Sequence, residues 1–287
     1  MKRALFIVAA MVITLVFTAG AWAEEPLANR LDRLEAKVAT LQGQVNTHQS
    51  QVSTLQGQVH KYESILRFLA VDTNVINGLK GPHLIFHHVN VHIQSGSGKT
   101  DDGGTPRGLG NLIIGYNELA GGMPPAPANF RTGAHNLVIG PDHKYSSWGG
   151  FVAGHNNSIS GAYSSVSGGW SNVASGQFSS VSGGYANKAN GQSSTVSGGE
   201  HNTAAGQYSS ILGGGNCAAT AQGSTVSGGF RNFANGIGSS VSGGMDNKAT
   251  GPQSSVSGGG NNNAIGQMSS ILGGSGKTAA AQYQTVP

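Results

Sequence analysis

The sequence predicts an all-β solenoid built from 15-residue coils and preceded by an α-helical coiled coil. Eight consecutive 15-residue units run without insertion from residue 163 to residue 282. Upstream, apolar residues recur in steps of three and four through six heptads between residues 27 and 69. Glycine accounts for 47 of the 287 residues and charged residues for only 10%, which is typical of a repetitive β architecture rather than of an enzyme with a thick apolar core.

The composition excludes several other classes of protein. Disordered chains normally carry a high net charge, whereas this chain carries only +4. Collagen needs glycine at every third position and many prolines, and the chain has 9 prolines. The basic residues are too few and too scattered to indicate a nucleic-acid partner, so we expect none.

Residues 1–23 have the features of a signal peptide. Lys2 and Arg3 precede an apolar run, and Ala-Trp-Ala at residues 21–23 forms a small-x-small cleavage signature before Glu24. An uncleaved membrane anchor is the alternative, because the run approaches the length that spans a bilayer. We expect cleavage, which leaves 14 basic and 12 acidic residues. The mature chain should then have no integral membrane domain and be exported to the extracellular space or the cell surface of a bacterium, in preference to the periplasm.

Residues 27–70 are predicted to form a coiled-coil stalk, because a 3.5-residue apolar period keeps one stripe of a helix facing a partner. We call this stripe the seam, and Leu69 continues it. Its members are Leu31, Leu34, Val38, Leu41, Val45, His48, Val52, Leu55, Val59, Tyr62 and Leu66. Valine alternating with leucine favours a parallel dimer, which conflicts with the trimer expected below. His48 is interpreted as a polar layer that fixes the register, with an ion site as the less favoured alternative.

Residues 148–287 are predicted to form the solenoid head. Each unit contains Ser, then Ser or Thr, then Val or Ile, followed by a Gly-Gly pair and, later, an alanine. The pattern predicts two short strands per coil, Ser-Ser-Val-Ser and x-Asn-x-Ala-x, with the valine and the alanine inside. We expect the Gly-Gly pair and the later glycine to supply positive φ angles at two corners. Gly168→Val should therefore disrupt its coil.

One valine and one alanine per coil form a thin core. Ordering fifteen residues costs more free energy than the burial of two small side chains contributes. A second face buried against other copies of the chain would supply the missing free energy of folding, and the coiled coil would hold those copies together. We therefore expect a parallel oligomer.

Residues 71–147 are predicted to be a β transition or capping region. Asn-Leu-Ile-Ile-Gly at residues 111–115 and Asn-Leu-Val-Ile-Gly at residues 136–140 are more hydrophobic relatives of the strand and turn of the repeat. The proline-rich stretch at residues 123–130 is interpreted as an inserted loop.

The Asn-Leu-Val-Ile-Gly motif, the alanine and glycine columns and the coiled coil together resemble the YadA-like trimeric autotransporter adhesins. The resemblance covers residues 111–282 for the head repeats and the coiled coil as a stalk. It implies a left-handed parallel β-roll, a homotrimer, and adhesion to a host, neighbour-cell or matrix surface. The stalk precedes the head here, and we expect no C-terminal membrane anchor.

Histidines and one loop type suggest ligand sites. On a strand, His88 and His92 share one face, and three copies of that face would offer imidazoles to a transition metal. Exposed or hydrogen-bonded histidines are the favoured interpretation, so we expect no metal. Two Gly-Ser-Gly-Lys-Thr segments suggest a phosphate loop, but Ile93 and Ile271 stand where its first glycine is required.

The remaining polar residues give no catalytic pattern. Cys217 is interpreted as a buried small residue, with an intersubunit disulfide as the alternative. Glu200 and Asp246 are the only acidic residues in the eight units, which excludes a glycosidase carboxylate pair and acid-rich calcium coils. We expect no catalytic residue and no cofactor.

The corner after each Gly-Gly pair holds the variable residues of the repeat. Trp170, Tyr185, Phe230 and Met245 stand there, and exposed side chains of this kind can form a surface-binding stripe. Loop residues under weak constraint are an equally supported interpretation.

These features together predict a secreted, non-enzymatic, oligomeric protein that acts in cell adhesion or as an extracellular structural rod. The alternative is a lattice- or glycan-binding solenoid of the ice-binding type without an adhesin role, since Ser and Thr columns repeat at a fixed pitch. Mixed Ser and Thr disfavour it, and thermal hysteresis would identify it. A β-helix enzyme acting on polysaccharide would need Asp, Arg and Lys clustered across adjacent coils, which the sequence lacks.

Overall fold

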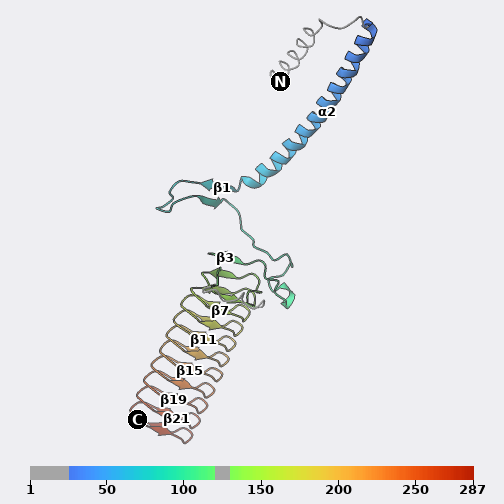
Figure 1. The fold of residues 1–287 in the computed structure, drawn as a ribbon. Coiled ribbons are helices and arrows are strands. Elements are labelled where there is room, and N and C mark those ends of the chain that lie inside the picture. The colour runs from blue at the N-terminus through green and yellow to red at the C-terminus, as the bar shows by residue number, and fades with distance from the viewer. Residues whose placement is uncertain (1–25, 120–129) are drawn as a thin grey trace. The chain divides into compact units, whose positions relative to one another are not determined.

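The computed structural model describes residues 26–119 and 130–287, which form two compact units that divide between Val91 and His92 (Figure 1). The predicted signal peptide at residues 1–23 lies outside the described residues. So do residues 123–129 of the predicted proline-rich loop.

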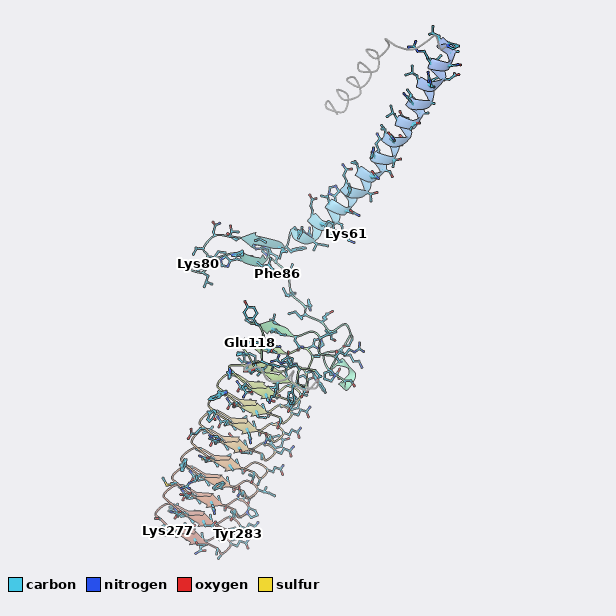
Figure 2. The ribbon with its side chains drawn as sticks, viewed as in Figure 1. Lys61, Lys80, Phe86, Glu118, Lys277 and Tyr283 are labelled. Atoms are coloured by element: carbon cyan, nitrogen blue, oxygen red, sulfur yellow. The ribbon has the colours of Figure 1, made fainter. Side chains whose placement is uncertain are left out.

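The first unit contains one long helix and a β-hairpin. Helix α2 (Leu27–Leu66) has no buried residue, and Figure 2 shows its side chains projecting outward along its whole length. Strands β1 (Leu69–Asp72) and β2 (His83–Phe86) pair in antiparallel fashion. The predicted helix is confirmed. The prediction that Leu69 continues the seam is wrong, because Leu69 pairs with Phe86 in the hairpin, which begins directly after the helix.

The second unit is a parallel β-solenoid, as predicted. Its strands form a twelve-stranded and a ten-stranded parallel sheet (Figure 1). Each of the ten coils from β4 and β5 to β22 and β23 contributes one strand to each sheet, whereas the first strand, β3, and the last, β24, belong to the twelve-stranded sheet alone. The twelve-stranded sheet contains β3 (Leu112–Ile114), β4 (Leu137–Ile139), β6 (Phe151–Ala153), β8 (Ser165–Val166), β10 (Ser180–Val181), β12 (Thr195–Val196), β14 (Ser210–Ile211), β16 (Thr225–Val226), β18 (Ser240–Val241), β20 (Ser255–Val256), β22 (Ser270–Ile271) and β24 (Thr285–Val286). The ten-stranded sheet contains β5 (Lys144–Tyr145), β7 (Ser158–Ile159), β9 (Val173–Ala174), β11 (Lys188–Ala189), β13 (Thr203–Ala204), β15 (Ala218–Ala219), β17 (Phe233–Ala234), β19 (Lys248–Ala249), β21 (Asn263–Ala264) and β23 (Thr278–Ala279). A single 3₁₀ turn, η1 (Asp102–Gly104), precedes β3.

The core is a column of small side chains along the solenoid. Val166 and Ala174 are fully buried, as are their equivalents in the following coils, so the predicted interior positions are confirmed. Ser164 and Asn172, two residues before each of them, are also fully buried. The interior of each coil is therefore half polar.

The buried asparagines form a hydrogen-bonded ladder that links successive coils. The side-chain oxygen Oδ1 of Asn172 accepts from the backbone N–H of Asn187 at 2.9 Å. Its amide nitrogen Nδ2 donates to the carbonyl oxygens of Gly168 (3.2 Å) and Gly184 (2.9 Å). From its buried position, each amide thus satisfies backbone groups at the corner of its own coil and of the next one.

The coil length changes near the start of the stack. Leu137 pairs with Phe151, and Phe151 with Ser165, which are 14-residue steps, whereas Ser165 pairs with Ser180, a 15-residue step. Gly154 and Gly169 occupy equivalent corners with φ angles of 99° and 79°. Gly168 is the residue without a counterpart in the shorter coils.

Two expectations about glycine are wrong. Gly168 does not have a positive φ, which belongs instead to the second glycine of the pair, Gly169. The later glycine, Gly176, also lacks a positive φ; a Cβ there would overlap the carbonyl oxygen of Gly191 in the next coil. At that corner Phe178 adopts the left-handed conformation, with φ of 59°. Close backbone approach, rather than φ, requires glycine at position 176.

The two glycines of one pair should respond differently to substitution. In the middle of the stack, a Cβ on Gly198 meets no atom within 4 Å, whereas Gly199 has a φ of +86° and a Cβ there would overlap Gly214. We expect Gly199→Ala to lower the free energy of unfolding by about 2 kcal/mol or more. Gly198→Ala, the matched control, places its Cβ against no atom of its own chain and should lower the free energy of unfolding by less than Gly199→Ala does. Equal melting of the two variants in circular dichroism would contradict this corner assignment.

The asparagine ladder should contribute to stability at each step. Asn202 Oδ1 accepts from the N–H of Cys217 at 3.0 Å, and Nδ2 donates to the carbonyls of Gly198 and Gly214. Asn202→Ala leaves these buried groups unsatisfied and should cost about 3 kcal/mol. The control is Asn190→Ala, which removes an exposed amide bonded to Ser175 and should leave the urea midpoint nearly unchanged. Equal midpoints for both variants would disprove the role of the ladder.

Candidate functional site

The four predicted stripe residues lie in one column along the solenoid, which we call the corner column. Isolated parallel bridges connect its members, from His155 through Trp170, Tyr185, Glu200, Gly215, Phe230, Met245 and Gly260 to Ser275. Trp170 and Met245 are each 51% exposed, Tyr185 40% and Phe230 38%. The column is therefore a continuous outer surface that carries large apolar side chains.

Rings at the start of the corner column stack on one another. The ring centroids of Trp170 and Tyr185 are 5.1 Å apart, and His155 lies edge-on to Trp170 at 6.1 Å. His201, one residue beyond the column, packs edge-on to Tyr185 at 5.1 Å. The two histidines were not predicted as members of the stripe. Only the three-dimensional register could identify them, because their types do not repeat in the sequence.

The later part of the corner column combines apolar and paired charged side chains. The guanidinium of Arg231 lies 5.0 Å from the centre of the Phe230 ring. Arg231 also forms an ion pair with Asp246, with 3.0 Å between Nε and Oδ1. Asp246 is therefore already neutralised by a neighbour in the preceding coil.

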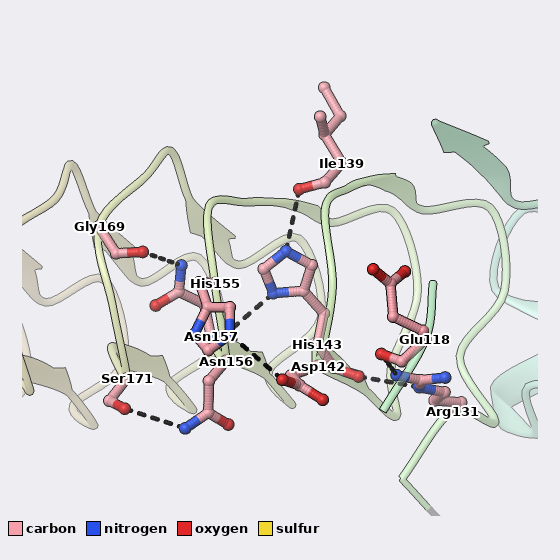
Figure 3. A network of polar contacts seen from close by, with 10 residues as sticks. All are labelled: Glu118, Arg131, Ile139, Asp142, His143, His155, Asn156, Asn157, Gly169 and Ser171. Carbon is pink, nitrogen blue, oxygen red and sulfur yellow. Dashed lines mark hydrogen bonds and ion pairs between the residues drawn. The ribbon is translucent and has the colours of Figure 1, made fainter. Parts of the chain in front are cut away.

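At the start of the ladder His143 replaces the asparagine (Figure 3). Its side chain is fully buried. Nδ1 accepts from the backbone N–H of Asn157 at 3.2 Å, so Nε2 carries the proton and donates to the carbonyl of Ile139 at 2.9 Å. Burial lowers the pKa of His143 below its ordinary value of 6.5. The imidazole is thus held neutral.

The residues around His143 form a network of polar contacts (Figure 3). Arg131 donates to the carbonyl oxygens of Asn117, Glu118 and His143. Asp142 and His155 lie 3.3 Å apart between Oδ2 and Nε2. These contacts fix the backbone of the first coils.

Cys217 takes the place of asparagine once in the ladder. Its backbone N–H donates to Asn202, and its sulfur lies 3.7 Å from the carbonyl of Gly229. Cys217 is 1% exposed, and burial raises the pKa of its thiol. The thiol is enclosed by its own coil, in agreement with a buried small residue.

The predicted strand that would place His88 and His92 on one face does not exist. Residues 87–94 have no strand, and His88 adopts a left-handed conformation with φ of 55°. His88 belongs to the first unit and His92 to the second. Within the described ranges, no group of three or more His, Cys, Asp or Glu side chains is arranged to hold a metal ion.

The Gly-Ser-Gly-Lys-Thr loop at residues 96–100 is closed by its own hydrogen bonds. Asp102 accepts from the hydroxyl of Ser95 and from the N–H of Arg107 (2.8 Å), and the Ser95 hydrogen bond is the main cause that lowers the pKa of Asp102 to about 2. His135 accepts from the N–H of Ser95 and lies 2.8 Å from the carbonyl of Thr100. A pocket of about 290 Å³ beside this loop is lined by Lys99 and His92.

Among residues 26–119 and 130–287, neither the seam of α2 nor the outer face of the twelve-stranded sheet has a partner. Seam residues such as Val45 and Leu55 are 47% and 58% exposed, and His48 Nδ1 lies 3.1 Å from Gln51 Oε1. The outer sheet face begins with Leu112, Leu137 and Phe151 in register. It continues as a Ser and Thr column, beside which Leu212 and Leu272 are exposed. These leucines interrupt the hydroxyl surface that a lattice-binding face needs.

No helix in the described part of the chain combines the length and the apolar character needed to cross a bilayer. No protein-family model matches the sequence, and no curated protein matches it either.

The buried imidazole of His143 predicts a pH-dependent stability. The unfolded chain binds a proton at His143 more readily than the folded chain does, because burial lowers the pKa in the folded state. The contribution of His143 to the free energy of unfolding is therefore complete above pH 6.5 and is lost as the pH falls below that value. Protonation also removes the acceptor for the N–H of Asn157. We expect the melting temperature of the parent to fall between pH 7.5 and pH 5. The fall should be smaller in His143→Asn, which restores the ladder amide, and identical curves would contradict the assignment.

Proposed function

We propose that this protein is an exported, non-enzymatic oligomer that presents its solenoid as a binding surface, as an adhesin or structural rod outside the cell. The observation that carries the proposal is the unpartnered seam of α2. Forty residues form a helix without one buried side chain, and an isolated helix of this kind is marginal in water. A seam of valines and leucines at heptad spacing is stabilised when it packs on further copies of itself.

The solenoid supplies a second reason for self-association. The first glycine of each Gly-Gly pair is glycine in all eight units, yet it has no positive φ, and a Cβ on most of them meets no atom within 4 Å. Nothing within one chain therefore requires glycine there. Close approach of another backbone would require it. The apolar side chains of Leu112, Leu137 and Phe151 on the neighbouring sheet face favour the same interpretation.

We propose three copies in parallel arrangement. The thin, half-polar interior of each coil leaves the sheet face to bury apolar surface between copies. The resemblance to trimeric adhesin heads described above agrees with this number. Binding rather than catalysis is proposed because the acidic side chains of the repeats are a lone Glu200 and an Asp246 paired with Arg231.

The seam can be tested by a charge placed inside it. Leu41→Asp puts a carboxylate into the centre of the seam, while Asn46→Asp puts the same charge on the solvent side of α2. We expect light scattering to give three times the single-chain mass for the parent and for Asn46→Asp. Leu41→Asp should give a lower mass, because a buried unpaired charge is costly.

Two outcomes would revise the proposal. A parent that is a folded monomer would remove the self-association argument. An unchanged mass for Leu41→Asp would show that the solenoid assembles without the helix.

A further inference from the structure

The corner column carries the same pattern of residues twice, four coils apart. Trp170, Tyr185 and Lys188 stand 60 residues before Phe230, Met245 and Lys248. We call the first triplet ledge 1 and the second ledge 2. In each ledge, two consecutive coils place a large apolar side chain in the column, and the second coil adds a lysine three residues later.

Each ledge is exposed to solvent, and its lysine is available to contact a ligand. Lys188 and Lys248 are exposed, and neither has an ion-pair partner among the residues that the structure describes. Each lysine lies in register beside an apolar residue of the preceding coil, Val173 for Lys188 and Phe233 for Lys248. Three residues of extended chain span at most about 10 Å, so one ligand can contact the rings and the lysine together.

We infer that the two ledges bind one anionic polysaccharide, in which uronic acid sugars alternate with uncharged sugars, along the axis of the solenoid. A sugar ring presents an apolar C–H face, which packs on aromatic and methionine side chains. Its carboxylate fits an unpaired ammonium group. This inference rests on the proposed binding role of the solenoid and names the ligand class for its surface.

The charge pattern favours a sparsely charged polymer. Each ledge offers one unpaired lysine, and the ledges are separated by four coils, about 19 Å at ~4.8 Å per coil. Between them stands Glu200, which disfavours a ligand with a charge on every unit. Single-stranded nucleic acid, which carries a phosphate at each nucleotide, needs a denser row of cations.

Two weak ledges on one rigid scaffold act together. An exposed ion pair contributes little alone, but a chain held at one ledge finds the second at a high effective concentration. The fixed four-coil spacing therefore gives a long polymer an advantage over its single sugar.

The test measures hyaluronate binding by residues 24–287 in affinity electrophoresis, with dextran and an oligothymidylate as comparison ligands. We expect binding to hyaluronate, in which glucuronate alternates with an uncharged sugar, that weakens with added salt, and little binding to the other two. Lys188→Gln with Lys248→Gln should weaken binding about tenfold or more. Trp170→Ala with Phe230→Ala should do the same.

The matched control variants remove lysine and aromatic side chains from positions outside the ledges. Lys80→Gln with Lys99→Gln changes the net charge equally, and Tyr208→Ala with Tyr283→Ala removes two exposed rings from another corner. Both should bind as the parent does. Equal weakening by the charge control would overturn the inference in favour of unspecific attraction, and preferred binding of dextran or of the oligothymidylate would overturn the ligand class.

Light scattering on the same samples separates this inference from the proposed function. A trimer that fails to bind hyaluronate refutes the ledges alone. A monomer whose binding depends on both ledges supports the ledges and refutes self-association.

Discussion

Register between coils is the constraint on which the rest of the solenoid depends. Strands of two residues form few hydrogen bonds each, so the backbone N–H and C=O groups at the corners must also find hydrogen-bond partners. The asparagine amides do this: the N–H of Asn172 donates to the Oδ1 of Asn157, and the Oδ1 of Asn172 accepts from the N–H of Asn187. Because every amide must meet the same backbone atoms in the next coil, the ladder holds the corners of successive coils in register. It does so across the 15-residue step from Asn172 to Asn187 and, through the imidazole of His143, across the 14-residue step from His143 to Asn157.

Because the coils stack tightly inside, residue types vary mainly at the outward-facing positions of the solenoid. The carbonyl of Gly191 comes so close to Gly176 that no side chain fits there, and Val166 and Ala174 fill the remaining space. Residues such as Trp170 and Phe230 contribute nothing to these contacts. They remain 51% and 38% exposed although each contacts a neighbouring ring or guanidinium, and exposed apolar side chains have a cost in solubility, which is why the corner column carries the functional argument.

The repeat period and the inner valine and alanine could be predicted because they are periodic. Other features depend on atoms of a neighbouring coil, which no local pattern reveals. The asparagine was predicted only as part of a short strand, without its buried hydrogen bonds, and the glycine at position 176 was predicted from a φ requirement. His143 breaks the sequence column while preserving its hydrogen bonds. Leu69 satisfied the heptad pattern, but the hairpin beginning at that residue overrode it. The pairing of Trp170 with His155 likewise required the register.

Self-association and ligand binding are connected by the weakness of a single ledge. One exposed ring pair and one lysine give a contact that thermal motion breaks easily. A second ledge four coils away increases the affinity for the polymer, and further copies of the chain would increase it again. The asparagine ladder fixes the spacing between the ledges, and in the oligomer that we propose the seam of α2 would hold the copies together. A surface of small, charge-poor coils can therefore adhere firmly to a polymer without any deep pocket, provided that the seam of α2 keeps the copies together.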